Sequence, residues 1–141
     1  MASVRDIIHQ RELFSVSETD TVAEVARRMA EQNVGAILVL DEGRLRGILS
    51  ERDIMKRVVL ERRNPDTTFV SEVMSTDLVT IDELSTVEDA MEAMQAHQCR
   101  HLPVTRGSNV VAFLSMRDLM NHELASKTEE IHHMRAYIHG T

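Results

Sequence analysis

Cysteine, tryptophan and other aromatic residues are scarce in this chain. The single Cys99 excludes an intramolecular disulfide and a metal site with several cysteine ligands, and we expect it to be a small core residue. One tyrosine and three phenylalanines leave no platform for stacking nucleic-acid bases. The net charge of −7 also disfavours binding to a phosphate backbone. We therefore expect no nucleic-acid partner.

Long apolar runs and familiar catalytic motifs are absent as well. No run of about 18 apolar residues is present, and the chain does not start like a secretion signal, so we expect a soluble, cytoplasmic protein without membrane insertion. A Gly-x-x-x-x-Gly-Lys phosphate loop and a paired nucleophile and base are missing, so we expect no enzyme. His132 and His139 would share a helical face, but an exposed tail explains them better than a metal site does.

What the chain does contain is an internal repeat. Residues 15–55 align with residues 80–120 at a constant offset of 65 without a gap. The ten identical pairs are Glu18/Glu83, Thr21/Thr86, Val22/Val87, Met29/Met94, Val39/Val104, Leu49/Leu114, Ser50/Ser115, Arg52/Arg117, Asp53/Asp118 and Met55/Met120. A fixed period indicates that one structural unit occurs twice. Because each copy is small for an independent core, we expect the copies to pack as one unit with a crevice between them.

Each copy predicts the order strand, helix, strand, strand, helix, in the α/β class and of the α+β kind. Thr21 and Thr86 each precede an apolar helical pattern and have an acid three residues later, which is typical of a helix start. The predicted strands lie at 13–16, 36–40 and 45–49 and at 78–81, 101–105 and 110–114, with further helices from Ser50 to about Asn64 and from Ser115. Short helical segments at 4–8 and 70–74 precede the copies.

These patterns divide the chain into three predicted parts. The first repeat with its leading segment covers 1–65, the second repeat covers 66–122, and a helical extension covers 123–141. Leu124, Ile131, Met134 and Ile138 form a narrow apolar stripe in the extension, which predicts a contact with a second copy or another partner. A disordered tail is the alternative.

The closest match between the copies lies at the end of the second strand of each predicted hairpin. Gly47-x-x-Ser50-x-x-Asp53 corresponds to Ala112-x-x-Ser115-x-x-Asp118. A Ser-x-x-Asp sequence at a helix start is most often only a cap, in which the side chains satisfy free backbone N–H groups. Its occurrence in both copies, at the same distance after a strand, favours a functional role.

Two further features are the Thr-Val helix starts and the sequence His101-Leu102-Pro103-Val104. On the basis of all these motifs, residues 4–122 resemble a tandem pair of cystathionine-β-synthase (CBS) domains. The resemblance implies two βαββα repeats related by a pseudo-two-fold axis and packed through their small sheets. It also implies that the clefts bind adenosine-containing ligands such as AMP, ADP, ATP or S-adenosylmethionine, with no cofactor required.

The resemblance further implies which residues bind such a ligand. Asp53 and Asp118 would accept hydrogen bonds from the ribose hydroxyls, a bond for which a carboxylate is suited. Ser50 and Ser115 would lie beside the ribose and phosphate, at a helix start that offers N–H donors. The remaining implied ligand-binding residues are Arg100, His101, Leu102, Pro103, Thr80, Ile81 and Arg117 in the second repeat and Gly47, Ala36, Ile37 and Ser15 in the first.

The two copies are not equivalent. Arg100 and His101 correspond to Gly35 and Ala36, so the first copy lacks a cation there, and Gly47 corresponds to Ala112, whose methyl group could crowd a ligand. The sequence therefore favours a cleft around Asp118 for a phosphate-bearing nucleotide. The cleft around Asp53 is expected to be weaker, empty or suited to a less charged ligand.

Together these inferences favour a regulatory module that senses an adenosine nucleotide and transmits its occupancy to an unidentified protein, as a homodimer. The alternative is a structural interaction module without a ligand. A small enzyme that acts on an adenosine compound is less favoured.

Overall fold

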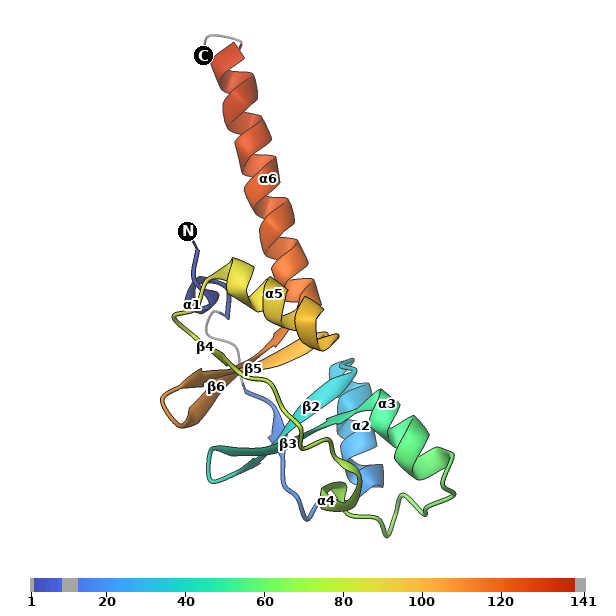
Figure 1. The fold of residues 1–141 in the computed structure, drawn as a ribbon. Helices are drawn as coiled ribbons and strands as arrows, with labels where there is room; N and C mark the ends of the chain where they lie inside the picture. The colour runs from blue at the N-terminus through green and yellow to red at the C-terminus, as the bar shows by residue number, and fades with distance from the viewer. Residues whose placement is uncertain (1, 9–12, 139–141) are drawn as a thin grey trace.

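The two repeats each form a three-stranded sheet with helices (Figure 1), in a computed structural model that describes residues 2–8 and 13–138. The first sheet has the order β1-β2-β3 and the second the order β4-β5-β6. The strands are β1 (Ser15–Val16), β2 (Ala36–Asp41), β3 (Arg44–Ser50), β4 (Ile81–Asp82), β5 (His101–Arg106) and β6 (Asn109–Ser115). In both sheets the short first strand runs parallel to the central strand, and the hairpin is antiparallel. This confirms the predicted fold class.

The helices follow the predicted order. They are α1 (Val4–Ile8), α2 (Val22–Gln32), α3 (Glu51–Ile54), the π-helical turn η1 (Met55–Val59), α4 (Val70–Val73), α5 (Val87–His97) and α6 (Met116–Ile138). The predicted helix from Ser50 is therefore an α-helical turn that continues in π-helical form. The predicted first strands are shorter than expected, because only two residues of each pair with the neighbouring strand.

Local geometry repeats as faithfully as the sequence does. The Thr21 side chain accepts a hydrogen bond from the Glu24 backbone N–H (3.2 Å), and Thr86 accepts one from Asp89 (3.0 Å). Asn33 and Gln98 end α2 and α5 in the left-handed conformation, with φ of 55° and 52°. Both hairpins carry a register shift at the same place, after Val39 and after Val104.

The leading helices α1 and α4 are exchanged between the repeats. Val4 and Ile7 of α1 are buried in the core of the second repeat, among Val87, Met94 and other residues. In the same way, Val70 and Val73 of α4 are buried in the core of the first repeat. Backbone bonds hold each helix in place, from Val4 N–H to the Ser85 carbonyl (2.8 Å) and from Val70 N–H to the Asp20 carbonyl (2.9 Å).

The exchange of α1 and α4 affects how the chain divides into repeats. The boundaries 1–65, 66–122 and 123–141 stay a prediction about the sequence, but in space residues 4–8 pack with the second repeat. The repeats also contact each other directly through β3 and β6, the predicted packing through the sheets. The two cores are thus separate clusters joined by crossed connections and by a sheet contact.

Other sequence expectations have mixed outcomes. Cys99 is partly buried against the second core, and burial raises the pKa of its thiol. His139 lies outside the described residues. Within residues 2–8 and 13–138, no helix is long and apolar enough to cross a membrane.

The exchange predicts where destabilisation appears. Val4→Ala and Val70→Ala should each lower the free energy of unfolding by roughly 1–3 kcal/mol, because both side chains are fully buried. Native-state hydrogen exchange of backbone amides should show that Val4→Ala weakens protection mainly in α5 and β5, and Val70→Ala mainly in α2 and β2. Val59→Ala, at a side chain with 64% exposure, is the control. Loss of protection in the opposite repeats would contradict the exchange.

Candidate functional site

The first Ser-x-x-Asp sequence forms a closed capping box. The Ser50 backbone N–H and hydroxyl both donate to Asp53 Oδ2 (3.0 Å each), and the Asp53 N–H donates to Ser50 Oγ (3.1 Å). The capping interpretation is therefore correct for this turn. Asp53 is only 7% exposed, so its carboxylate is part of the packed structure.

A residue outside the repeat alignment completes the Asp53 environment. The Ser75 hydroxyl donates to Asp53 Oδ1 (2.9 Å), so both carboxylate oxygens accept hydrogen bonds from the chain. Ser75 also exchanges backbone hydrogen bonds with Ile48 (2.9 and 3.0 Å). A Cβ atom on Gly47 would lie 2.6 Å from Met74 Sδ and 2.9 Å from the Ser75 carbonyl oxygen. The close approach that requires Gly47 is thus made by the protein's own 74–75 segment.

The second Ser-x-x-Asp sequence has the same cap at the start of α6. The Ser115 N–H donates to Asp118 Oδ2 (2.9 Å), and the Asp118 N–H donates to Ser115 Oγ (3.1 Å). Asp118 is partly exposed, in contrast to Asp53. Ser115 pairs with His101 across the hairpin, as Ser50 pairs with Ala36 in the first repeat. The hairpin therefore brings His101, Ser115 and Asp118 to one end of the second sheet.

His101 lies against the ring of Phe113. The ring centroids are 5.0 Å apart with an interplanar angle of 30°, which is a stacked arrangement. Burial lowers the pKa of the His101 imidazole below its usual value, and the carboxylate of Asp118 acts in the opposite direction. His101 is thus a partly buried, uncharged base close to an acid, and a neighbouring anion would favour its protonation.

The other candidate residues divide into exposed and core positions. Arg100 and Thr80 are exposed, and Ser15 is partly buried on β1. Ile37, Leu102 and Ile81 are 2%, 0% and 7% exposed and belong to the two cores, so their side chains stabilise the sheets. Ala36 is 6% exposed, and Pro103 is also buried. Only the backbone of these buried residues is placed to meet a ligand without repacking.

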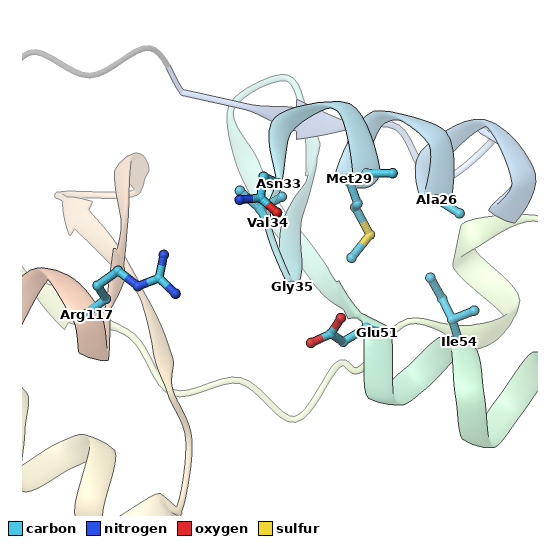
Figure 2. A pocket seen from close by; sticks show the side chains of 9 residues that line it. Ala26, Met29, Asn33, Val34, Gly35, Glu51, Ile54 and Arg117 are labelled. Carbon is cyan, nitrogen blue, oxygen red and sulfur yellow. The ribbon is translucent and has the colours of Figure 1, made fainter.

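A cleft of about 420 Å³ separates the first repeat from the start of α6. Figure 2 shows its lining, which is Ala26, Met29, Ala30, Asn33, Val34, Gly35, Glu51, Ile54 and Arg117. Arg117 extends from the second repeat towards the first, and the Glu51 carboxylate points into the same space. Arg117 is the one candidate residue in this lining. The cleft therefore has an apolar wall and one charge of each sign.

Sequence reasoning missed three residues of this region. Ser75 lies outside the aligned repeat, and its bond to Asp53 spans 22 residues, so no local pattern reveals it. Phe113 was visible as an aromatic residue in a strand, two residues before Ser115, where strand alternation places both on one face. Glu51 corresponds to Met116, a charge difference between the copies that could have been noticed.

Metal ligation finds no support in the described part of the chain. Residues 2–8 and 13–138 contain no group of three or more His, Cys, Asp or Glu side chains that could hold a metal ion. His133 lies 3.7 Å from Glu129 on α6, and its ring packs edge-on against His132.

Fold and site together define a tandem pair of βαββα units with a capped Ser-x-x-Asp turn in each. The CBS domain model matches twice, at residues 4–60 and 70–125. The chain belongs to the CBS domain family.

Known relatives have the same organisation. A CBS domain-containing protein, YhcV, of Bacillus subtilis is 38% identical over 128 residues, which cover 91% of this chain and 90% of that protein. A CBS-domain protein of signal-transduction type from Burkholderia ambifaria has a TM-score of 0.82 at 30% identity, covering 88% of this chain and 95% of that one. CBSX2, solved in complex with AMP, has a TM-score of 0.78 at 19% identity, covering 90% of this chain and 99% of that one. CBS-domain pair proteins of this type are regulatory.

The environment of His101 predicts a pH-dependent stability. Between its lowered pKa in the folded protein and its ordinary value of about 6.5, the unfolded chain holds a proton that the folded chain does not. The free energy of unfolding should therefore rise with pH through this window, fall as the pH drops through it, and level off once both states are protonated. His101→Gln should reduce that dependence in urea denaturation between roughly pH 5 and 7. His97→Gln, at an exposed histidine, should retain it. An unchanged slope in His101→Gln would contradict the assignment.

Proposed function

We propose that the protein is a regulatory module that senses an adenosine-containing nucleotide, chiefly in the second cleft, and passes its occupancy to another protein. The observation that carries the proposal is the cluster of His101, Ser115 and Asp118 at one end of the second sheet, beside the exposed Arg100. Membership of a family with a neighbour solved in complex with AMP supports the ligand class. AMP, ADP, ATP and S-adenosylmethionine all remain candidates.

The residues around Asp118 suit the ligand chemistry. Asp118 is partly exposed and can accept from ribose hydroxyls, and it lies at the start of α6, where the helix dipole favours a phosphate. The Arg100 guanidinium supplies a planar fork of donors for the same phosphate. His101 on its Phe113 platform adds a group that becomes charged when an anion approaches.

The first cleft is less suitable for a phosphate. Both oxygens of Asp53 already accept hydrogen bonds, from Ser50 and Ser75, and the residue is buried. Glu51, two residues before Asp53, lines the cleft of Figure 2, where its carboxylate would repel an anion, although Arg117 supplies a cation from the other repeat. We therefore expect this cleft to be weaker, empty or occupied by a ligand with less negative charge.

A homodimer with an unidentified regulated protein is part of the proposal. Exposed apolar side chains on the helices favour association, among them Met55, Val59, Leu60, Met91 and Met120. A purely structural interaction module is the second candidate, and the capping bonds of both aspartates favour it. A cytoplasmic location and the absence of catalysis stay predictions from the sequence.

Paired variants test the asymmetry. AMP, ATP and S-adenosylmethionine are titrated by calorimetry into Asp118→Asn and Asp53→Asn, which keep an acceptor for the cap. Asp118→Asn should weaken the best nucleotide by about tenfold or more, because it removes a charged acceptor. Asp53→Asn should change that affinity little. Equal losses in the two variants would contradict the asymmetry.

Thermal shifts separate sensing from a structural role. A ligand that binds only the folded state must raise the melting midpoint, by an amount equivalent to about 2.7 kcal/mol at one hundred times its Kd. No shift with any of the three compounds would favour the structural module. Consumption of the compound during the titration, followed by chromatography, would instead indicate an enzyme.

The Ser75 hydroxyl predicts a gain of binding in the first cleft. Ser75→Ala removes the bond to Asp53 Oδ1 and leaves that oxygen to a ligand. Measured in the Asp118→Asn background, the residual affinity for an adenosine compound should rise about threefold to tenfold. Ser71→Ala, an exposed serine on α4, is the matched control. No gain would show that Ser75 does not compete with a ligand.

A further inference from the structure

Most of α6 lies beyond the folded body of the protein. The helix packs near its start against α1, α5 and β6, and the rest extends away from both sheets (Figure 1). Among the described residues of this extension, Leu124, Ile131 and Met134 are 63%, 52% and 57% exposed. Most of the stability of a protein helix comes from packing of its apolar side, so a partner is expected to cover this one.

The apolar residues follow a seven-residue repeat. Leu124 and Ile131 occupy a positions, Met120 and Met134 occupy d positions, and residue 138 is the next a position in the sequence. A strict repeat of this kind favours a left-handed coiled coil, because it keeps one seam facing a partner helix. Lys127 occupies the remaining d position, where its stem can cover apolar surface while its ammonium group reaches water.

We infer that this stripe pairs with the same stripe of a second copy of the chain in a parallel, two-stranded coiled coil. The charged residues that flank the stripe favour a second copy of the chain as the partner and a parallel orientation of the two helices. Glu130 is at a g position and Arg135 at the following e position. In a parallel pair, g of one helix faces the next e of the other, so the Glu130 of each copy meets the Arg135 of the other copy, which gives two such pairs, one on each side of the seam.

The opposite direction does not use these charges. In an antiparallel pair, g positions face g positions, which would bring Glu123 and Glu130 of the two copies together. Like charges in such positions are unfavourable. The outward b and c positions carry His132 and His133, which are exposed and keep that side of the helix polar. The chain is thus complementary to itself in one orientation.

This inference goes beyond the proposed nucleotide sensing and does not depend on it. The two are connected physically, since the first turn of α6 carries Asp118 and the same continuous helix carries the stripe. Over 23 residues, the helix spans about 35 Å at 1.5 Å per residue. Nucleotide titrations of the full chain still report on sensing if the helices do not pair.

Cysteine crosslinking tests the parallel register directly. In the full-length Cys99→Ala protein, Met134→Cys places a thiol at a d position, which faces its equivalent only in the parallel pair. Mild oxidation should convert most chains to a covalent dimer on non-reducing gels. His133→Cys, one residue away and outside the seam, is the matched control. Crosslinking of Met134→Cys no faster than that of His133→Cys would overturn the inference, whatever the oligomeric state by ultracentrifugation.

Charge reversal tests the contact between Glu130 and Arg135. In the Met134→Cys background, Glu130→Arg and Arg135→Glu should each slow crosslinking severalfold, because like charges then face each other. A mixture of the two variants should form mixed dimers faster than either forms its own, since both pairs become attractive. Lys127→Leu should accelerate crosslinking, because it removes a charge from the seam. Slowing that the mixture does not reverse would exclude the parallel pairing and favour another protein as the partner.

Discussion

The exchange of the two leading helices is the constraint on which the rest of the structure depends. α1 completes the core of the second repeat and α4 completes the core of the first, although each helix precedes the other repeat in the chain. A repeat of this size has little apolar area of its own to bury, so each core depends on the added helix. Because the two connections cross, the repeats must lie side by side, with β3 and β6 in contact. The crevice that separates the first repeat from the start of α6 is a consequence of this arrangement.

Both aspartates stabilise the fold even when no ligand is bound. Asp53 and Asp118 both satisfy backbone N–H groups at a helix start, which is a structural role with a known benefit to stability. The same geometry places a carboxylate, which can accept from ribose hydroxyls, at a helix start, where the helix dipole favours a phosphate. The copies differ in burial, since Asp53 is 7% exposed and accepts a bond from Ser75, whereas Asp118 is partly exposed. We therefore expect ligand binding at the more exposed of the two capped turns, which is the one with Asp118.

Much of the fold was predictable because the patterns that encode it are local. The strand at 36–40 is a continuous apolar run, and Thr21 and Thr86 cap their helices as their spacing indicates. The lengths of the first strands were overestimated, because only two residues of each pair with the central strand. At the site, the sequence predicted the capped turns in which Ser50 pairs with Asp53 and Ser115 pairs with Asp118. It could not reveal Ser75 or the position of Arg117 in the cleft, because both contacts join distant segments.

The sequence alone determined the period of 65 residues, the order of elements, the two capped turns and the apolar stripe of the last helix. These features depend on neighbours within a few residues, so periodicity and capping patterns are sufficient to find them. The tertiary structure alone decided which leading helix joins which core, which aspartate is covered and which charges face the cleft. The reason is that burial and hydrogen bonding between distant segments depend on the path of the whole chain. Because of that path, two capped turns with nearly the same sequence have different surroundings.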